Sequence, residues 1–287
     1  MKRILITGIS GFIGQYLYKQ RPVDVQVTGS YFLNKPELIA IDLVKLDLID
    51  VEEFISNSAQ FDVVIHCAAE SSLSECEKKP ERTHTINTIA TEKLAQWSVK
   101  QKSKFIYLST DIVFDGEKGD YSESENPIPI NIYGKTKLDA EQRILKIHDN
   151  AVIIRLALCL GKGLGNTFGF INWIENKLEI NEEIPLYFDE IRTPVSVKFA
   201  ANTIWELMEN EYTGIVHLAG KEKINRFDLG LKILDYLNLD NKHLLKRISS
   251  KSSTYPRPKD VSMKSDLMDK VLKTPQEDLI TLIKNIL

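Results

Sequence analysis

Short apolar runs alternate with longer helical patterns through the first half of the chain. The apolar runs predict strands at residues 3–7, 25–29, 38–41, 62–66, 104–108 and 151–156. The segments between them predict helices at residues 12–20, 51–58, 81–100 and 131–147. Strands that are apolar throughout and alternate with helices are typical of a parallel sheet covered on both faces. The pattern therefore predicts the α/β class and a Rossmann-type doubly wound parallel sheet.

Two parts of the chain depart from this alternation. Residues 111–130 are rich in Gly, Asp, Glu, Ser and Pro, which predicts a long surface loop. After Gly161 the pattern loosens, with helices expected at 167–177, 197–210 and 226–237 and strands at 184–188 and 214–218. This mixture predicts a smaller C-terminal α+β lobe, from which the chain returns to the main sheet near residues 190–215.

The composition narrows the range of partners. The chain of 287 residues is 43% hydrophobic and 27% charged, with a formal net charge of -3. It has no basic excess that would favour nucleic acid or an anionic membrane surface. Its longest apolar stretch, residues 151–160, is too short to span a bilayer and contains Arg155. The three cysteines, Cys67, Cys76 and Cys159, form no CxxC pair and predict a reduced, cytoplasmic protein without a structural metal.

Three glycines, Gly8, Gly11 and Gly14, follow the first predicted strand and precede the first predicted helix. The first allows a tight turn, the second lets the backbone approach a pyrophosphate, and the third lets the helix pack closely on the strand. The N-terminus of the helix then offers unpaired N–H groups to the phosphates. A glycine turn without a ligand is the alternative. We expect a dinucleotide-binding domain at residues 1–160 and a mainly substrate-binding lobe at residues 161–287.

The end of the second predicted strand bears on the choice of cofactor. NAD-binding proteins usually carry an acid there, which holds the ribose hydroxyls. In this chain Ser30 and Tyr31 stand at that place, and Lys35 follows a little further on. Lys35 is suited to face a 2′-phosphate, although a solvated loop lysine is the alternative. The sequence therefore favours NADP, with NAD possible.

A tyrosine and a lysine in the segment Tyr133-Gly134-Lys135-Thr136-Lys137 carry the candidate chemistry. Tyr133 and Lys137 are four residues apart and lie on one face of the predicted helix. A nearby ammonium stabilises a phenolate and lowers the tyrosine pKa from its free value of about 10, which helps proton exchange with a carbonyl or an alcohol. Ser109 and Thr110 follow a strand at the carboxyl edge, where open α/β sheets bind ligands. A surface Tyr–Lys pair is the alternative, but the order of these motifs favours an active site.

Seven short motifs carry a resemblance to a known family. They are the glycine turn, Asp47-Leu48, His66-Cys67-Ala68-Ala69, Ser109-Thr110-Asp111-Ile112-Val113-Phe114-Asp115-Gly116, the tyrosine–lysine segment, Arg192-Thr193-Pro194 and Arg257-Pro258. Through these motifs, which extend over nearly the whole chain, the sequence resembles the extended short-chain dehydrogenase/reductase family. It is most similar to dTDP-4-dehydrorhamnose reductases and to the related regulatory β subunit of methionine adenosyltransferase. The stretch from Ser109 to Gly116 is the most specific of the seven.

The resemblance implies a site, residue by residue. Thr110, Tyr133 and Lys137 correspond to the catalytic set. The residues expected to contact the cofactor are Gly8, Ser10, Gly11, Phe12, Ile13, Gly14, Asp47, Leu48, Cys67, Ala68, Ala69, Asn87, Ser109, Tyr133 and Lys137. The residues expected to contact the substrate are Thr110, Asp111, Arg192 and Arg257. The two arginines would bind the diphosphate of a nucleotide sugar, or instead form structural ion pairs.

The implied function is an NAD(P)H-dependent reductase of a nucleotide-activated keto-sugar, with a homodimer as a possible assembly. Two positions depart from the family. The reductases usually carry a tryptophan that packs on the sugar where this chain has Leu158, and the related 4,6-dehydratases carry a glutamate where it has Ile112. A non-catalytic, NADP-binding regulatory subunit and a sugar-nucleotide epimerase are therefore kept as alternatives.

Overall fold

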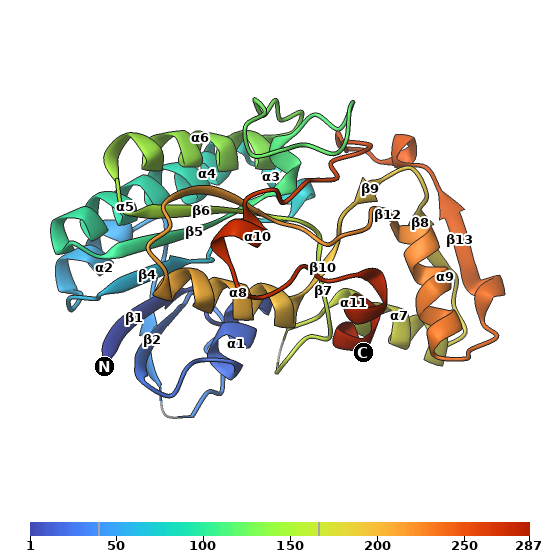
Figure 1. Ribbon diagram of the computed structural model, residues 1–287, viewed down its shortest axis with the longest axis horizontal. Helices are drawn as coiled ribbons and strands as arrows, with labels where there is room; N and C mark the ends of the chain where they lie inside the picture. Colours follow the sequence, from blue (N-terminus) through green and yellow to red (C-terminus); the bar gives the residue numbers. More distant parts are fainter. Residues whose placement is uncertain (40, 166) are drawn as a thin grey trace.

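The computed structural model describes residues 1–39, 41–165 and 167–287. At its centre lies a seven-stranded sheet in the order β11-β6-β5-β4-β1-β2-β3, in which every neighbouring pair is parallel (Figure 1). The strands are β1 (Lys2–Thr7), β2 (Val25–Tyr31), β3 (Asp42–Lys45), β4 (Val63–His66), β5 (Lys104–Thr110), β6 (Ala151–Leu156) and β11 (Gly214–Leu218). The first six follow the Rossmann order 3-2-1-4-5-6. The predicted doubly wound sheet is confirmed.

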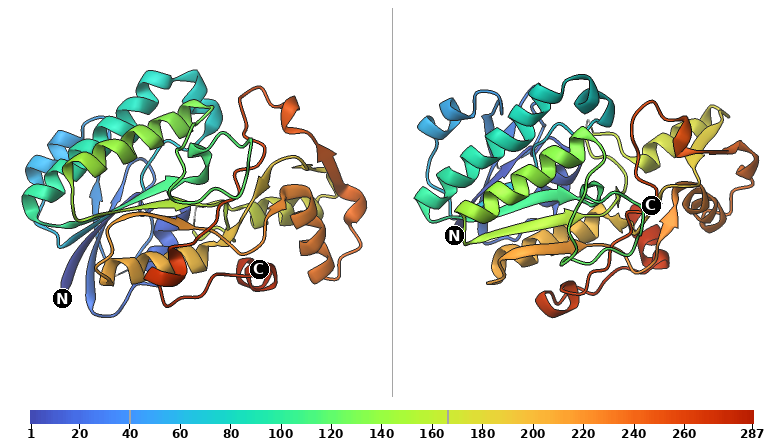
Figure 2. Two further views of the ribbon diagram at one scale, coloured as in Figure 1. Left: turned by 45° about the horizontal axis from the view of Figure 1, so that its top comes forward. Right: turned by 90° about the horizontal axis from the view of Figure 1, so that it is seen from above.

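Helices cover both faces of this sheet (Figures 1 and 2). On one face α1 (Phe12–Lys19) and α8 (Val197–Glu209) pack against each other, and the indole N–H of Trp205 donates to the Leu17 carbonyl at 3.0 Å. The other face is covered by α2 (Val51–Asn57), α5 (Ala90–Gln101) and α6 (Ile132–Ile147). Among the described residues, no helix is both long and apolar enough to cross a membrane.

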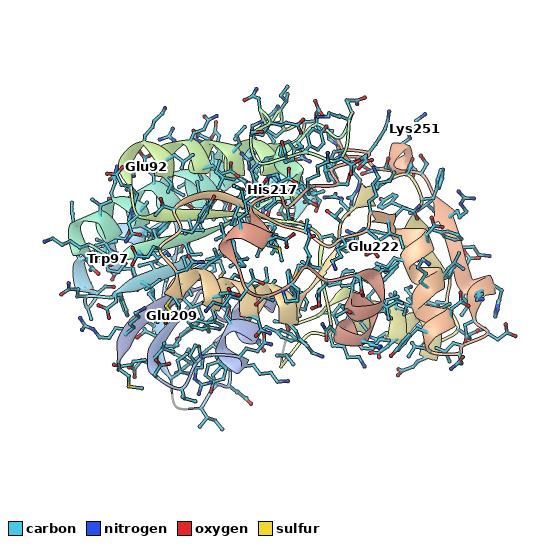
Figure 3. The ribbon with its side chains drawn as sticks, in the orientation of Figure 1. Glu92, Trp97, Glu209, His217, Glu222 and Lys251 are labelled. Atoms are coloured by element: carbon cyan, nitrogen blue, oxygen red, sulfur yellow. The ribbon has the colours of Figure 1, made fainter. Side chains whose placement is uncertain are left out.

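The helix predicted at 81–100 is one continuous segment with an irregular middle. It begins as α4 (Pro80–His84), passes through a π-helical turn at Thr85–Ile89 and continues as α5. A π-helical turn shifts the side chains that follow it around the helix and is frequent at functional sites. The short helix α3 (Leu73–Lys78) precedes this segment. At the outer end of α5, Trp97 packs edge-on against Phe54 and Phe61 (Figure 3).

The strand predicted at 38–41 is wrong. Residues 38, 39 and 41 do not belong to a strand, and residue 40 lies outside the described residues. The strand lies just beyond, as β3, which pairs with β2 from Asp42 opposite Thr28. Ile39 is 84% exposed, while Leu38 and Ile41 are partly buried against the core from outside the sheet. Pairing with β2 decides the position of this edge strand, and local hydrophobicity does not.

A smaller group of elements lies beside the carboxyl edge of the sheet (Figure 2). Its core joins α7 (Phe170–Glu179), α9 (Arg226–Tyr236) and α11 (Leu279–Ile286) to the parallel pair β8 (Ile184–Tyr187) and β13 (Leu245–Ile248). Two short pairs, β7 (Cys159–Leu160) with β10 (Val195–Ser196) and β9 (Ile191–Arg192) with β12 (Ile224–Asn225), connect it to the sheet. The chain returns to the sheet through α8 and β11, and α10 (Met268–Val271) packs beside β11.

Candidate active site

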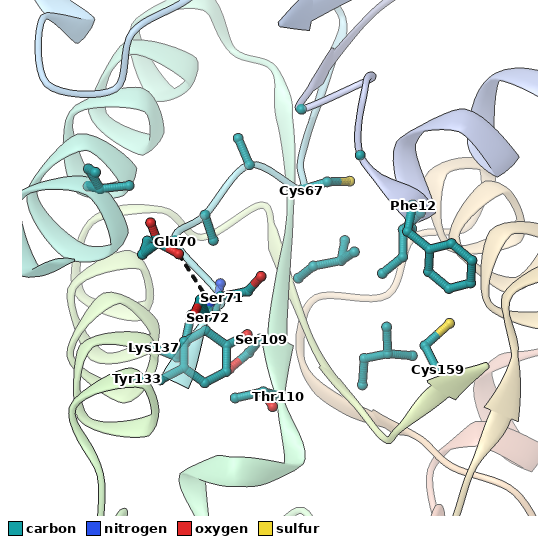
Figure 4. A pocket seen from close by; sticks show the side chains of 18 of the residues that line it. Phe12, Cys67, Glu70, Ser71, Ser72, Ser109, Thr110, Tyr133, Lys137 and Cys159 are labelled. Carbon is teal, nitrogen blue, oxygen red and sulfur yellow. Dashed lines mark hydrogen bonds between the residues drawn. The ribbon is translucent and has the colours of Figure 1, made fainter. Parts of the chain in front are cut away.

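A cleft of about 1030 Å³ follows the carboxyl ends of the central strands and continues towards the smaller lobe. Segments far apart in the sequence meet there, including the turn after β1, the ends of β4 and β5, and the first turn of α6 (Figure 4). All site residues predicted from the sequence line this cleft except Asn87 and Lys35. The topology therefore brings the predicted cofactor, catalytic and substrate residues to one place.

The glycine turn at one end of the cleft takes a shape that only glycine permits at two positions. Gly8 has a φ of 71°, and a Cβ on it would lie 2.9 Å from the Cα of Ala68. A Cβ on Gly14 would overlap the Gly8 carbonyl oxygen, so close packing of α1 on β1 needs a glycine there. Gly11 caps α1 without a side-chain hydrogen bond, which leaves the first N–H groups of the helix free to bind an anion.

The region expected to hold the adenosine carries few charges. Asp47 and Leu48 line it as predicted, together with Ser30, Tyr31 and Phe32. The Asp47 carboxylate accepts a hydrogen bond from the Ile49 N–H at 2.9 Å and so also shapes its own turn. The exposed Lys35 lies outside the set of lining residues, so the structure does not bring its side chain to the ribose.

Ser109 and Thr110 end β5 at the middle of the cleft. The Thr110 hydroxyl accepts a hydrogen bond from the Ile112 N–H at 3.2 Å and caps a short 3-10 turn. The Ser109 hydroxyl donates to the carboxylate of Glu141, which forms a buried, two-pronged ion pair with Arg155 at 2.8–3.3 Å. This buried network fixes the end of β5 against α6 and so holds the two hydroxyl residues in position.

Tyr133 and Lys137 enter the cleft from the first turns of α6. The helix is capped by Asn131, whose side chain accepts from the Gly134 N–H at 2.8 Å. The Lys137 ammonium lies 4.1 Å from the centre of the Tyr107 ring and forms no ion pair with the residues that the structure describes. Figure 4 shows both side chains on the same side of the cleft as Ser109 and Thr110. The predicted catalytic set is therefore assembled in one place.

Burial shifts the pKa values of Tyr133 and Lys137 in opposite directions. Burial and the Asp111 carboxylate hold the pKa of Tyr133 well above its usual range, and the hydrogen bond to Thr110 opposes them only in part. Burial lowers the pKa of Lys137 to about 7, against the opposing effects of Glu141 and Cys67. The lowered Tyr133 pKa expected from the sequence is thus not found. The protein favours the neutral phenol of Tyr133 and brings the pKa of Lys137 close to neutral pH.

The two predicted substrate arginines are both ion-paired. Arg192 Nη1 lies 2.9 Å from the Asp111 carboxylate, and both side chains are buried. Arg257 forms a two-pronged pair with Glu190, which is fully buried. Each arginine also lines the cleft, so structural pairing is found at both residues, and contact with a ligand stays a prediction.

Asn87 lies behind the wall of the cleft, among the residues that support it. Its side chain is fully buried in the π-helical turn and does not line the cleft. It accepts from the Glu70 N–H at 2.8 Å and donates to the Glu70 carbonyl and the Thr136 hydroxyl. Asn87 therefore joins the loop after β4 to α6 and supports the cleft wall from behind, and its contact with a cofactor stays a prediction.

Several lining residues were missed by reasoning from the sequence. They are polar or charged and include Glu70, Ser71, Ser72, Arg82 and Arg226. The first three extend the His66-Cys67-Ala68-Ala69 motif along the floor of the cleft, so its continuation was the available signal. Arg226 stands at the start of α9 in the smaller lobe, and no local pattern connects it with residues of the sheet.

The strand order, the glycine turn and the Thr110–Tyr133–Lys137 set define a protein of the extended short-chain dehydrogenase/reductase class. More narrowly, the chain belongs to the RmlD substrate binding domain family, whose model matches residues 1–286. The resemblance deduced from the motifs is confirmed.

The relatives of this chain include both reductases and a subunit of a methionine adenosyltransferase. It is 32% identical over 242 residues to a probable low-salt glycan biosynthesis reductase, Agl14, of Haloferax volcanii, covering 82% of this chain and 80% of that protein. It is 31% identical over 265 residues to methionine adenosyltransferase 2 subunit beta of Xenopus laevis, and the match covers 90% of this chain and 78% of that protein. The crystal structure of a hypothetical dTDP-4-dehydrorhamnose reductase from Sulfolobus tokodaii superposes with a TM-score of 0.84 at 32% identity. The match covers 97% of this chain and 98% of that chain. The dTDP-4-dehydrorhamnose reductase of Yersinia enterocolitica has a TM-score of 0.85 at 27% identity, with full coverage of both chains.

Proposed function

We propose that this protein is an NAD(P)H-dependent reductase of a nucleotide-activated keto-sugar. The observation that carries the proposal is the position of Thr110, Tyr133 and Lys137 in the same cleft as the glycine turn. The names of the Haloferax and Yersinia relatives support the reductase class. Carbonyl reduction needs a proton donor and a hydrogen-bond donor at the carbonyl oxygen, and this set supplies both.

The residues of the cleft fit a dinucleotide cofactor. The uncapped N-terminus of α1 and the close approach that Gly8 and Gly14 permit suit its diphosphate. NADP is proposed first, because Ser30 and Tyr31 stand at the end of β2, where an acid would hold free ribose hydroxyls, and NAD is kept as possible. When bound, the nicotinamide supplies the hydride. The chain's own residues bind and orient the reactants and move the proton.

In the proposed reaction Tyr133 gives its phenolic proton to the carbonyl oxygen as that oxygen becomes an alkoxide. Its raised pKa keeps the phenol protonated at neutral pH, so the donor is ready before the reaction. The Thr110 hydroxyl, which donates to Asp111 at 3.2 Å and also hydrogen-bonds with Tyr133, would turn to hydrogen-bond the same oxygen. Lys137, when protonated, stabilises the tyrosinate that remains. Orientation and stabilisation of the developing alkoxide supply most of the rate gain.

The lining of the cleft beside Thr110 is aliphatic, because Leu156 on β6 pairs with Thr110 on β5. Leu156, Ala157 and Leu158 line the cleft there, and Leu158 stands where the family's reductases usually carry a tryptophan. An aliphatic wall offers the sugar a smaller contact area than an indole. The proposal is therefore a keto-sugar reductase whose sugar differs from that of the family's rhamnose enzymes.

A second candidate is a regulatory subunit that keeps the fold and the cofactor but lacks turnover. The 31% identity to methionine adenosyltransferase 2 subunit beta favours it, as does the absence of the tryptophan at Leu158. Both candidates predict cofactor binding, so binding alone does not separate them.

The separating experiment measures NADPH and NADH consumption with a panel of dTDP- and UDP-linked keto-sugars, beginning with dTDP-4-dehydrorhamnose. Turnover with at least one member, lost in Tyr133→Phe, supports the reductase. Cofactor binding without turnover on any member, together with a stable complex with a methionine adenosyltransferase catalytic chain, supports the regulatory subunit and contradicts the first proposal.

A further inference from the structure

Three arginines converge where the cleft meets the smaller lobe. Arg192 comes from β9, Arg226 is the first residue of α9, and Arg257 follows β13 in the chain; all three line the cleft. The carboxylates that act on this group are Asp111 and Glu190. The cluster therefore holds one more positive charge than negative charge.

Two of the arginines already have carboxylate partners. Arg192 is paired with Asp111 at 2.9 Å, and Arg257 contacts both oxygens of Glu190. These pairs are largely shielded from water, because Asp111 and Glu190 have side-chain exposures of 4% and 0%. A ligand would have to compete with these carboxylates for either guanidinium.

Arg226 has no comparable partner. Its Nε lies 3.8 Å from the nearest Glu190 oxygen, which is too long for a hydrogen bond, and this buried atom has no hydrogen-bond partner among the described residues. The guanidinium carbon lies 5.7 Å from the centre of the Phe170 ring, and the side chain is 25% exposed. Burial, followed by the charges of Arg192 and Arg257, lowers the pKa of Arg226 to about 10, against the opposing effects of Glu190 and Asp111. A cation with unused donors thus faces the cleft.

We propose that Arg226 is the main anchor for the diphosphate of the nucleotide-sugar substrate, while the ion pairs of Arg192 and Arg257 shape the site around it. This inference rests on the proposed function. A guanidinium presents a planar fork of N–H donors that matches two phosphate oxygens. The diphosphate supplies the negative charge that the cluster lacks and the hydrogen-bond acceptors that Arg226 lacks. Lysine at this position would keep the charge but lose the fork.

The test measures binding of dTDP and of UDP by calorimetry, with NADP⁺ saturating. The variants are Arg226→Met and Arg226→Lys. The matched control is Arg247→Met, because Arg247 packs on the Phe188 and Phe227 rings of the same lobe and does not line the cleft. We expect Arg226→Met to weaken nucleoside diphosphate binding by about 10-fold or more and Arg226→Lys by less. NADP⁺ affinity and the control variant should be unchanged.

The melting temperature of the free protein separates ligand binding from a structural role. Removing a buried guanidinium without a hydrogen-bonded partner should leave the free protein as stable as before or more stable. Unchanged dTDP affinity in both Arg226 variants overturns the assignment of Arg226 while the proposed function stands. A lower melting temperature with equal losses of NADP⁺ and dTDP binding shows a structural role and also overturns it. If the wild-type protein binds NADP⁺ but neither nucleoside diphosphate, the proposed function fails together with this inference.

Discussion

Replacing Lys137 with methionine should change how the stability of the cofactor-free protein depends on pH. The Lys137 side chain is buried, and burial lowers its pKa to about 7 from the usual 10.5. Between these values the unfolded chain holds a proton that the native lysine has released. The unfolded state therefore binds more protons, and the free energy of unfolding rises with pH in this window. Below pH 7 both states are protonated, and the full cost of burying the charge remains.

The size of the effect follows from the same values. Each pH unit inside the window contributes about 1.4 kcal/mol, so roughly 2 kcal/mol of the rise between pH 7 and 9 belongs to Lys137. Burial also raises the pKa values of the Cys67, Cys76 and Cys159 thiols from the usual 9. These thiols therefore lose their protons at a lower pH in the unfolded chain than in the native protein, which lowers the free energy of unfolding as the pH rises above about 9. The measurement is therefore confined to pH 7–9.

Urea denaturation of the cofactor-free protein at pH 7, 8 and 9 provides the assay. Lys135→Met is the matched control, because Lys135 is an exposed lysine of the same helix. The wild type and the control should gain stability in parallel, and Lys137→Met should lack about 2 kcal/mol of that gain. An equal pH slope in Lys137→Met and wild type would refute the reasoning, since the buried ammonium would then not titrate in this range.

Two further substitutions test the framework of the site. Glu141→Gln leaves the buried Arg155 without a charge partner. Urea denaturation should show a free energy of unfolding lower by about 3–5 kcal/mol. A loss below about 1 kcal/mol would contradict the importance of this ion pair. Gly14→Ala places a Cβ against the Gly8 carbonyl, so α1 must move away from β1. Calorimetry should show NADP⁺ binding weakened by at least about 10-fold. Unchanged affinity would argue against a diphosphate bound at the glycine turn.

The parts of the fold that follow from local pattern were predictable. Strands such as β4 and β5 are buried along their whole length and carry central apolar runs, and the glycine turn needs only residues near each other in the chain. Thr110, Tyr133 and Lys137 were predictable because parallel strands end at one edge and because i and i+4 share a helix face. Their meeting in one cleft is a consequence of that topology.

The features that depend on tertiary contacts were not predictable. The edge strand β3 takes its place from pairing with β2, while the more apolar residues before it stay outside the sheet. The raised pKa of Tyr133 depends on burial and on Asp111, neither of which the helical spacing reveals. Arg226 reaches the cleft only because the smaller lobe folds over the carboxyl edge of the sheet.

The most direct test of the central claim is the turnover of Tyr133→Phe with the keto-sugar nucleotide that the wild-type protein reduces. The substitution removes only the phenolic oxygen, so NADP⁺ affinity should stay within about twofold of wild type while kcat falls by about 100-fold or more. Turnover equal to that of the wild type, with cofactor binding intact, would contradict the account, because the proton would then come from another group.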